Sequence, residues 1–222
     1  MALIQVPGKD EWVLRGDTAL TKAALEVTGT INWGLGIEHD PLFLAIKPGD
    51  VFIDVGAFIG DTSRAAEKLG AEVWAFEPYP DAFEALLKNC PRAHCFNAPV
   101  GDGRPMMATG QYGENNGNMG TRMVTFDGPP SLRIDDLRIP RVSLVKIDCE
   151  GCEPAALDGM AQTLKLHRPP ILIEVYDTML KKQGFVREDV LRRLRDLGYR
   201  LEVSVGREED DRLDYRAIPV TA

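Results

Sequence analysis

Short apolar runs alternate with longer stretches of helical periodicity along most of the chain. Apolar runs of five or six residues are typical of strands buried on both faces of a sheet. The runs with this character are Val51–Val55, Glu72–Phe76, His94–Ala98, Ser143–Asp148, Ile171–Val175 and Arg200–Val205. The segments between them with helical spacing are Asp61–Leu69, Tyr79–Asn89, Glu153–Leu166 and Arg187–Leu197. This alternation predicts a Rossmann-like α/β fold, with a mostly parallel central sheet and helices on both faces.

Two regions depart from this rhythm. Residues 1–46 contain a helical stretch near Thr18–Val27 and then a glycine-containing run that ends at Gly36. We expect them to form an N-terminal cap or lid ahead of a Rossmann-like domain over residues 47–222. Residues 101–130 are polar and rich in glycine, which predicts a long loop. Loops of this length within a compact domain are more often functional than neutral.

Composition and charge narrow the choice of partners. Of the 222 residues, 44% are hydrophobic and 27% are charged, which is typical of a globular chain. The net charge is −8, and acids and bases are scattered without a basic stripe, so we expect no nucleic-acid partner. The first residues carry charges and no run of about 18 apolar residues occurs, so we expect a cytoplasmic protein without membrane contact.

The four cysteines are Cys90, Cys95, Cys149 and Cys152. The last two frame a Cys-Glu-Gly-Cys sequence that could form half of a zinc site or a redox dithiol. A metal-binding module built from all four is therefore an alternative to an enzyme. We expect instead that they are reduced, small hydrophobic residues.

The most specific local motif joins a strand to a helix through glycines. The apolar run from Val51 ends in Asp54, turns through Gly56 and enters a helix after Gly60. Glycines in such a turn allow a bound nucleoside to approach the backbone closely. The spacing differs from the G-x-G-x-x-G of dinucleotide sites, which present a helix N-terminus to a pyrophosphate. It suits a ligand with an ammonium group and no phosphate, although a plain connecting turn is the alternative.

A second carboxylate follows at the distance expected of a ribose ligand. Glu77 ends an apolar strand 23 residues after Asp54, and Pro78 terminates that strand. In Rossmann-like sheets an acid about 20 residues beyond the glycine turn accepts hydrogen bonds from ribose hydroxyls. Glu77 is therefore predicted to bind a nucleoside.

A third motif gathers charges at the end of the strand that precedes Cys149. Lys146, Asp148, Glu150 and Glu153 follow one another closely, and Glu174 ends the next apolar strand. Charges are costly to bury unless they are paired or used, which places the cluster at the carboxyl edge of the sheet, where ligands bind. Lys146 and Asp148 share one face of their strand, so a mutual salt bridge is the structural alternative.

With these motifs the chain resembles FkbM-type methyltransferases, which use S-adenosylmethionine. The resemblance rests on Asp54–Gly60, Ala75–Pro78, Lys146–Gly151 and Pro170–Glu174, with a weaker echo in Leu132–Asp136. It spans roughly residues 48–176 and implies a class I methyltransferase fold. It further implies methylation of a hydroxyl oxygen on a sugar, natural product or other small molecule.

The resemblance also implies which residues hold S-adenosylmethionine and its product S-adenosylhomocysteine. Residues lining the methionine part would be Asp54, Gly56, Ala57, Phe58 and Gly60, and Thr62 is a further predicted cofactor-binding residue. Glu77 would hold the ribose, with Pro78 as a further predicted cofactor-binding residue, and Asn97, Ala98 and Val100 would border the adenine. The family more often has Asn at the position of Phe58, and Arg133-Ile-Asp135 replaces its Thr-Leu-Asp motif.

Methyl transfer from a sulfonium is an in-line displacement, so positioning of the acceptor supplies much of the acceleration. The predicted catalytic residues are Lys146, Asp148 and Glu150. Asp148 or Glu150 would take the acceptor proton or orient the acceptor, and either could instead hold the methionine ammonium.

Three alternatives accompany this prediction. Asp148, Glu150 and Asp102 could supply oxygen ligands to magnesium, but the chain lacks a tight acidic loop and we expect no metal. A nicotinamide-dependent oxidoreductase would share the fold and the ribose acid, and a non-catalytic scaffold could keep the cofactor site. His39 precedes the first strand and could face the cleft, although we expect it at the surface.

Overall fold

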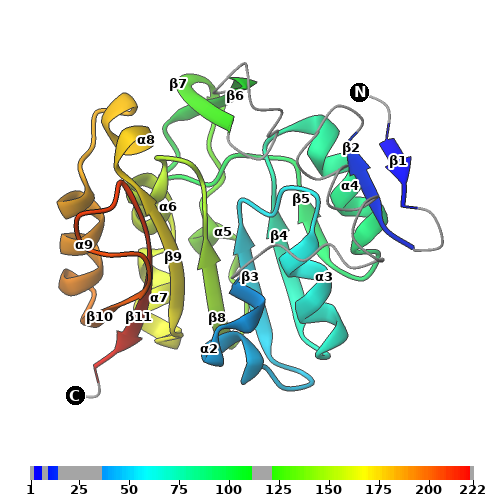
Figure 1. The fold of residues 1–222 in the computed structure, drawn as a ribbon, viewed down its shortest axis with the longest axis horizontal. Helices are drawn as coiled ribbons and strands as arrows, with labels where there is room; N and C mark the ends of the chain where they lie inside the picture. Colours follow the sequence, from blue (N-terminus) through cyan, green and yellow to red (C-terminus); the bar gives the residue numbers. More distant parts are fainter. Residues whose placement is uncertain (1–2, 7–9, 15–36, 112–121, 221–222) are drawn as a thin grey trace.

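The computed structural model describes residues 3–6, 10–14, 37–111 and 122–220. Its centre is a seven-stranded sheet with the order β10-β11-β9-β8-β3-β4-β5 (Figure 1). The strands are β3 (Val51–Val55), β4 (Glu72–Phe76), β5 (His94–Phe96), β8 (Val142–Ile147), β9 (Ile171–Tyr176), β10 (Tyr199–Val205) and β11 (Arg212–Pro219). β11 runs antiparallel to both of its neighbours, β9 and β10, and all other pairs in this sheet are parallel. The predicted mostly parallel sheet is therefore confirmed.

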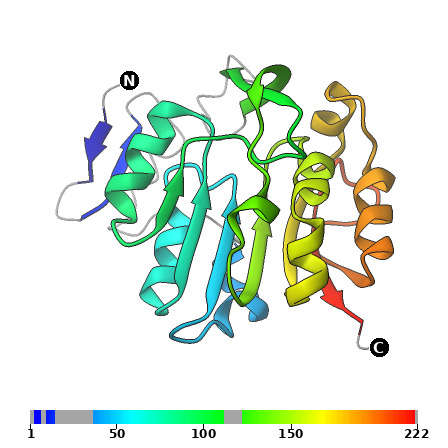
Figure 2. The same cartoon turned by 180° about the vertical axis from the view of Figure 1, so that it is seen from behind.

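Helices cover both faces of the sheet because each central strand is apolar on both sides (Figure 2). In β3, Phe52 packs toward one face and Ile53 toward the other. The helices on the Phe52 face are α2 (Pro41–Leu44), α3 (Asp61–Lys68) and α4 (Pro80–Asn89). The helices on the Ile53 face are α5 (Ile134–Leu137), α6 (Glu153–Gly159), α7 (Ala161–His167) and α9 (Arg187–Asp196). A further helix, α8 (Asp177–Lys182), directly follows β9.

The helix predicted over Glu153–Leu166 is two helices, and the continuous prediction was wrong. The break lies at Met160, whose φ of −122° and ψ of 12° are not helical. Close packing accompanies the break, because a Cβ on Gly159 would lie 1.8 Å from the carbonyl oxygen of Gly101. The chain entering residues 101–130 therefore crosses directly over the end of α6.

The long loop predicted over residues 101–130 contains an antiparallel hairpin, so this prediction was wrong in part. The hairpin consists of β6 (Pro105–Gln111) and β7 (Arg122–Pro130), and residues 112–121 lie outside the described residues. Met106 and Val124 are buried against Cys152 and Ala155. This apolar contact holds the hairpin above the carboxyl edge of the sheet, at the top of Figure 1.

The predicted N-terminal segment contributes several short elements. A small hairpin of β1 (Leu3–Gln5) and β2 (Trp12–Leu14) is joined to α4, since Asn89 Oδ1 accepts a 2.7 Å hydrogen bond from the Trp12 backbone N–H. The 3-10 helix η1 (Ile37–His39) precedes α2. The helix expected near Thr18–Val27 lies outside the described residues, and the lid role of residues 1–46 stays a prediction. No helix in the described ranges has the length and apolar character needed to span a membrane.

Candidate active site

The glycine turn connects β3 to α3 through left-handed backbone. Gly56 has a φ of 79°, and the N–H groups of Gly56 and Ala57 both donate to the carbonyl oxygen of Phe76 at 3.0 Å. A Cβ on Gly56 would lie 1.7 Å from the carbonyl oxygen of Asp148. The protein's own backbone therefore requires this glycine, in addition to any ligand.

Glu77 faces the same turn from the end of β4. Its Oε2 accepts a hydrogen bond from the Phe58 N–H, and its Oε1 accepts one from the Tyr79 N–H, both at 2.8 Å. The residue is 4% exposed, and burial raises its pKa to about 7 against the opposing effect of these hydrogen bonds. Each carboxylate oxygen can accept a second hydrogen bond, so the group fits a ribose diol.

Phe58 presents its N–H to Glu77 from a strained conformation. Its φ of 50° lies in the left-handed region, which Asn and Gly adopt more readily than bulky residues. Phe58 also packs against the cluster formed by Ile59 and the small N-terminal hairpin.

Asp54 and Lys146 form a buried ion pair behind the turn. Lys146 Nζ lies 3.1 Å from Asp54 Oδ1, and it donates a 2.8 Å hydrogen bond to the carbonyl oxygen of Gly56. Asp54 Oδ2 accepts a 2.6 Å hydrogen bond from the Ser63 hydroxyl, and Asp54 is fully buried. Burial opposes the charge on Lys146, but Asp54 and Asp148 outweigh it and raise the pKa of the lysine. This geometry holds the turn in place.

Asp148 stands between Lys146 and a second acid, Glu174. Its Oδ2 lies 3.6 Å from Lys146 Nζ, so the salt bridge considered from sequence is present. The carboxyl group of Asp148 also lies beside that of Glu174, with one oxygen of each within 4.8 Å of the other. Burial opposes ionisation of Asp148, yet Lys146 lowers its pKa; burial and Asp148 together raise the pKa of Glu174 well above its usual value.

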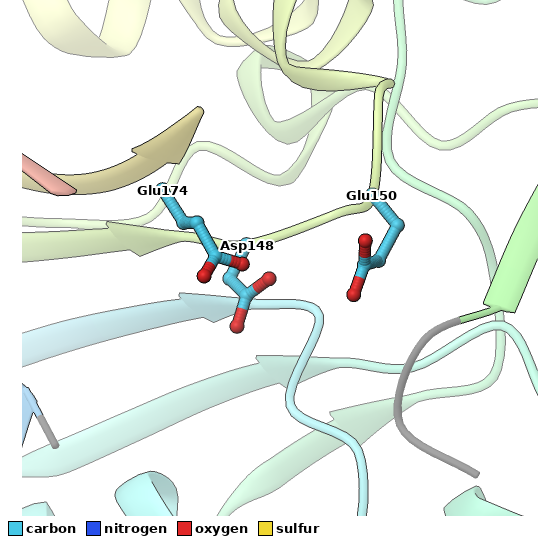
Figure 3. A group of neighbouring side chains, drawn as sticks. All are labelled: Asp148, Glu150 and Glu174. Carbon is cyan, nitrogen blue, oxygen red and sulfur yellow. The ribbon is translucent and has the colours of Figure 1, made fainter. Parts of the chain in front are cut away.

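Figure 3 shows that Glu150 joins Asp148 and Glu174 at the carboxyl edge. One oxygen from each of the three carboxylates lies within 4.8 Å of the others. Arg212 from the antiparallel β11 forms an ion pair with Glu174. This acidic edge, defined by Asp148, Glu150 and Glu174, could accept a proton or hold a divalent ion.

Asp102 is not part of the acidic edge, although sequence reasoning grouped it with Asp148 and Glu150. Both oxygens of the Asp102 carboxylate accept hydrogen bonds from Arg104 Nε, at 3.0 and 2.7 Å. Glu174 takes its place in the group. The parallel pairing of β8 and β9 brings Glu174 there.

The residues predicted to border the adenine follow β5. Asn97 donates a 2.9 Å hydrogen bond through Nδ2 to the carbonyl oxygen of Glu77, which ties the two strand ends together. Ala98 is partly buried, and Val100 is buried and bridges to Leu132. Thr62 is buried in the first turn of α3, and Pro78 is partly exposed beside Glu77. Their contacts with a cofactor stay predictions.

Sequence reasoning missed the anchoring of the hairpin β6–β7 to the Glu77 turn. Arg122 donates to both carboxylate oxygens of Asp81, at 2.7 and 3.1 Å, and stacks 4.6 Å from the ring centroid of Tyr79. The Tyr79 hydroxyl donates to the carbonyl oxygen of Met123. The sequence signal was Arg122 itself, a lone cation beside glycine-rich sequence.

The cysteines are free and lie in separate parts of the fold. Cys90 and Cys95 pack on the Phe52 face, whereas Cys149 and Cys152 lie beside α6 and the hairpin. Burial raises the pKa of Cys95 to about 11 and that of Cys149 well above its usual value. Among the described residues, the four cysteines do not gather into one group that could hold a metal ion.

Comparison with solved structures shows which fold the chain adopts. A methyltransferase FkbM from Methylobacillus flagellatus KT superposes with a TM-score of 0.55 at 16% identity, over 76% of this chain and 43% of that one. A TehB-like SAM-dependent methyltransferase from Corynebacterium glutamicum gives a TM-score of 0.50 at 18% identity, over 81% and 85% of the two chains. The fold is therefore that of the class I methyltransferases.

The family follows from the sequence model of the methyltransferase FkbM domain, which matches residues 54–201. The chain belongs to this family, as the resemblance of its motifs predicted. Hexuronic acid methyltransferase AglP of Haloferax volcanii is 30% identical over 144 residues, which cover 58% of each protein. A tRNA (guanine(37)-N(1))-methyltransferase of Aedes aegypti is 39% identical over 72 residues, or 30% of this chain and 13% of that protein. Each match thus spans less than two thirds of the relative's own length.

Proposed function

We propose that this protein transfers a methyl group from S-adenosylmethionine to a hydroxyl oxygen of a sugar or another small-molecule acceptor. The observation that carries the proposal is Glu77, a buried carboxylate held against the glycine turn by the Phe58 N–H. A carboxylate at this place suits the two hydroxyls of a ribose. The likeness to a protein named hexuronic acid methyltransferase supports a sugar acceptor.

The cofactor supplies an electrophilic methyl group, and the residues of the turn position it. Glu77 would accept the ribose hydroxyls, and Asn97 to Val100 would border the base. Asp54 is fully buried and ion-paired, so we infer that it orients the turn through Lys146 while Gly56, Ala57 and Phe58 present backbone to the methionine part. Anchoring of the hairpin by Arg122 would keep water away from the Glu77 side of the site.

Asp148 and Glu150 would act on the acceptor. The acceptor hydroxyl must lose its proton as the carbon–oxygen bond forms, and the acidic edge offers carboxylate oxygens at the end of β8. Lys146 lowers the pKa of Asp148, which favours its ionised form, and Glu174, whose pKa is raised, would share its proton with it. We infer a small-molecule acceptor over nucleic acid because the net charge of −8 includes no basic stripe.

Two other functions are compatible with the fold and are disfavoured. A nicotinamide-dependent oxidoreductase would need a glycine turn that accommodates a pyrophosphate, and the Gly56-x-x-x-Gly60 spacing does not match that fingerprint. A non-catalytic scaffold would have no need for the charged network at the carboxyl edge, whose burial is costly.

Calorimetric titration of the full chain with S-adenosylmethionine and, separately, NAD tests the proposal. We expect saturable binding of S-adenosylmethionine alone, weakened at least about tenfold (about 1.4 kcal/mol) by Glu77→Ala. The matched control is Glu72→Ala at the exposed start of the same strand, which should leave the affinity unchanged. Binding of NAD, or of neither ligand by the folded protein, would overturn the assignment.

The pH dependence of the same titration gives a second readout. Because the pKa of Glu77 is raised to about 7, its ionised form should predominate only above that pH. Affinity for S-adenosylmethionine should therefore rise as the pH increases through 7, since the carboxylate accepts the ribose hydrogen bonds. Glu77→Gln should remove this dependence.

A further inference from the structure

A cavity of about 390 Å³ lies on the sheet face that α2 covers, next to the acidic edge. Its walls come from η1, from the first half of β9, from the end of β10 and from the middle of β11. This volume lies within the range of small-molecule sites. His39, which the sequence analysis considered as a residue that could face a cleft, is among the lining residues.

The lining combines apolar walls with paired polar groups. Ile37, Leu172 and Val205 supply apolar surface. Asp40 and Arg216 face each other across the cavity wall, with Arg216 Nε donating a 2.7 Å hydrogen bond to Asp40 Oδ2. The guanidinium carries four further N–H donors, which can serve a ligand.

Donors and acceptors therefore stand together around this cavity. Its acids, Asp40 and Asp214, offset Arg216, so the site lacks the excess positive charge that a phosphate would need. Ser204 and His39 add groups that both donate and accept. A ring with an apolar face and several hydroxyls matches this set of groups.

Asp214 connects the cavity to the acidic edge. It is the register partner of Glu174 across β9 and β11, and it lines the cavity from the same face of the sheet. Burial and the charge of Asp148 raise the pKa of Asp214 to about 6, which Arg212 and Lys146 partly oppose. Because this carboxylate is poorly solvated, hydrogen bonds donated by ligand hydroxyls would stabilise its ionised form.

We propose that this cavity holds a sugar ring of the methyl acceptor, with Asp214 and Arg216 hydrogen bonding to its hydroxyls beside the acidic edge. The proposal rests on the proposed function for the acceptor's place in the reaction, but sugar binding is measurable without methyl transfer. Occupation of the cavity would leave another hydroxyl of the acceptor within reach of Asp148 and Glu150.

The test uses the full chain and the side-chain ¹H–¹⁵N spectrum of its histidines. The chain has three histidines, His39, His94 and His167, and only His39 lines the cavity. Methyl β-D-glucopyranoside and methyl β-D-glucuronide are titrated to their solubility limits, with cyclohexanol as a ring that carries one hydroxyl. His39→Gln assigns the signal, and each titration is repeated with S-adenosylhomocysteine present.

We expect a saturable shift of the His39 signal with at least one glycoside, no shift of His94 or His167, and no response to cyclohexanol. Asp214→Asn should weaken glycoside binding at least about fivefold, a typical effect of losing hydrogen bonds to a charged group. Asp196→Asn, at an exposed position of α9, is the matched control and should bind as the parent does. Arg216→Lys provides a second variant if Asp214→Asn does not fold.

Two outcomes separate this proposal from the proposed function. A folded protein that binds S-adenosylhomocysteine but gives no His39 shift with either glycoside would overturn the cavity assignment alone. Glycoside binding unaffected by both variants would overturn it as well. A His39 shift in a protein that binds neither S-adenosylmethionine nor S-adenosylhomocysteine would support the cavity and overturn the methyltransferase activity.

Discussion

The ammonium nitrogen of Lys146 in β8 lies 3.1 Å from Oδ1 of Asp54 in β3, and the two residues are register partners in adjacent parallel strands. Lys146 also reaches the carbonyl oxygen of Gly56, which links the acidic edge to the glycine turn. Its side chain is 7% exposed and that of Asp54 is fully buried, so neither charge is solvated by water. The glycine turn and the acidic edge are therefore both held by one buried cation, Lys146.

Lys146→Met should destabilise the protein by roughly 3–5 kcal/mol, because it leaves Asp54 buried without a counterion. Urea unfolding followed by circular dichroism measures the change. Lys165→Met, at an exposed position of α7, serves as the control and should shift stability by less than about 0.5 kcal/mol. The double variant Lys146→Met with Asp54→Asn should recover part of the loss; equal stability of the single and double variants would contradict the ion-pair explanation.

Gly56→Ala should be far more damaging than an alanine at another left-handed glycine. The new Cβ would lie 1.7 Å from the carbonyl oxygen of Asp148, so β3 and β8 would have to separate at the site. Gly184→Ala is the matched control, since Gly184 has a φ of 81° and nothing within 4 Å. We expect the free energy of unfolding to fall by about 1 kcal/mol for the control and by more than about 3 kcal/mol for Gly56→Ala. Gly56→Ala should also abolish S-adenosylmethionine binding. Similar losses of stability at both positions would contradict this explanation of the glycine turn.

Glu153→Gln should flatten the dependence of stability on pH. Burial raises the pKa of Glu153 to about 7, so the folded state holds its proton more tightly than the unfolded chain does. The stability that the protonated Glu153 contributes to the folded state is fully present below the usual carboxyl pKa and is lost as the pH rises through about 7. The variant should therefore gain stability relative to the parent at pH 8, on the order of 2–3 kcal/mol, and little at pH 4. The measurement is the denaturant midpoint of unfolding at the two pH values. Glu84→Gln, at an exposed position of α4, should have the same midpoint as the parent at both.

Methyl transfer should persist after exhaustive treatment with EDTA. Lys146 and Arg212 already contact Asp148 and Glu174, so two fixed cations offset the charge that a divalent ion would otherwise have to neutralise. The measurement is the rate of S-adenosylhomocysteine formation before and after chelation, with magnesium added back. A rate that falls at least about tenfold and returns with magnesium would show instead that the acidic edge binds a metal.

The central architecture could be predicted from the sequence because its signals are local. The apolar runs of β3, β8 and β9 are buried on both faces, and such strands need little context to be recognised. The glycine turn, Glu77 and the charges after β8 likewise follow strand ends that carboxyl-edge geometry brings together. The sequence therefore determined the fold class and the family, and it brought forward candidate acids for the site.

Tertiary structure alone decided which of these groups meet. Asp102 and Glu174 are both acids near strand ends in the sequence, but the pairing of β8 with β9 selects Glu174 as the neighbour of Asp148. The antiparallel β11 brings Arg212 and Asp214 to the same edge, and the cavity forms where η1 meets β10 and β11. These contacts join residues distant in the chain, and their energies arise from burial and charge pairing that no local pattern encodes.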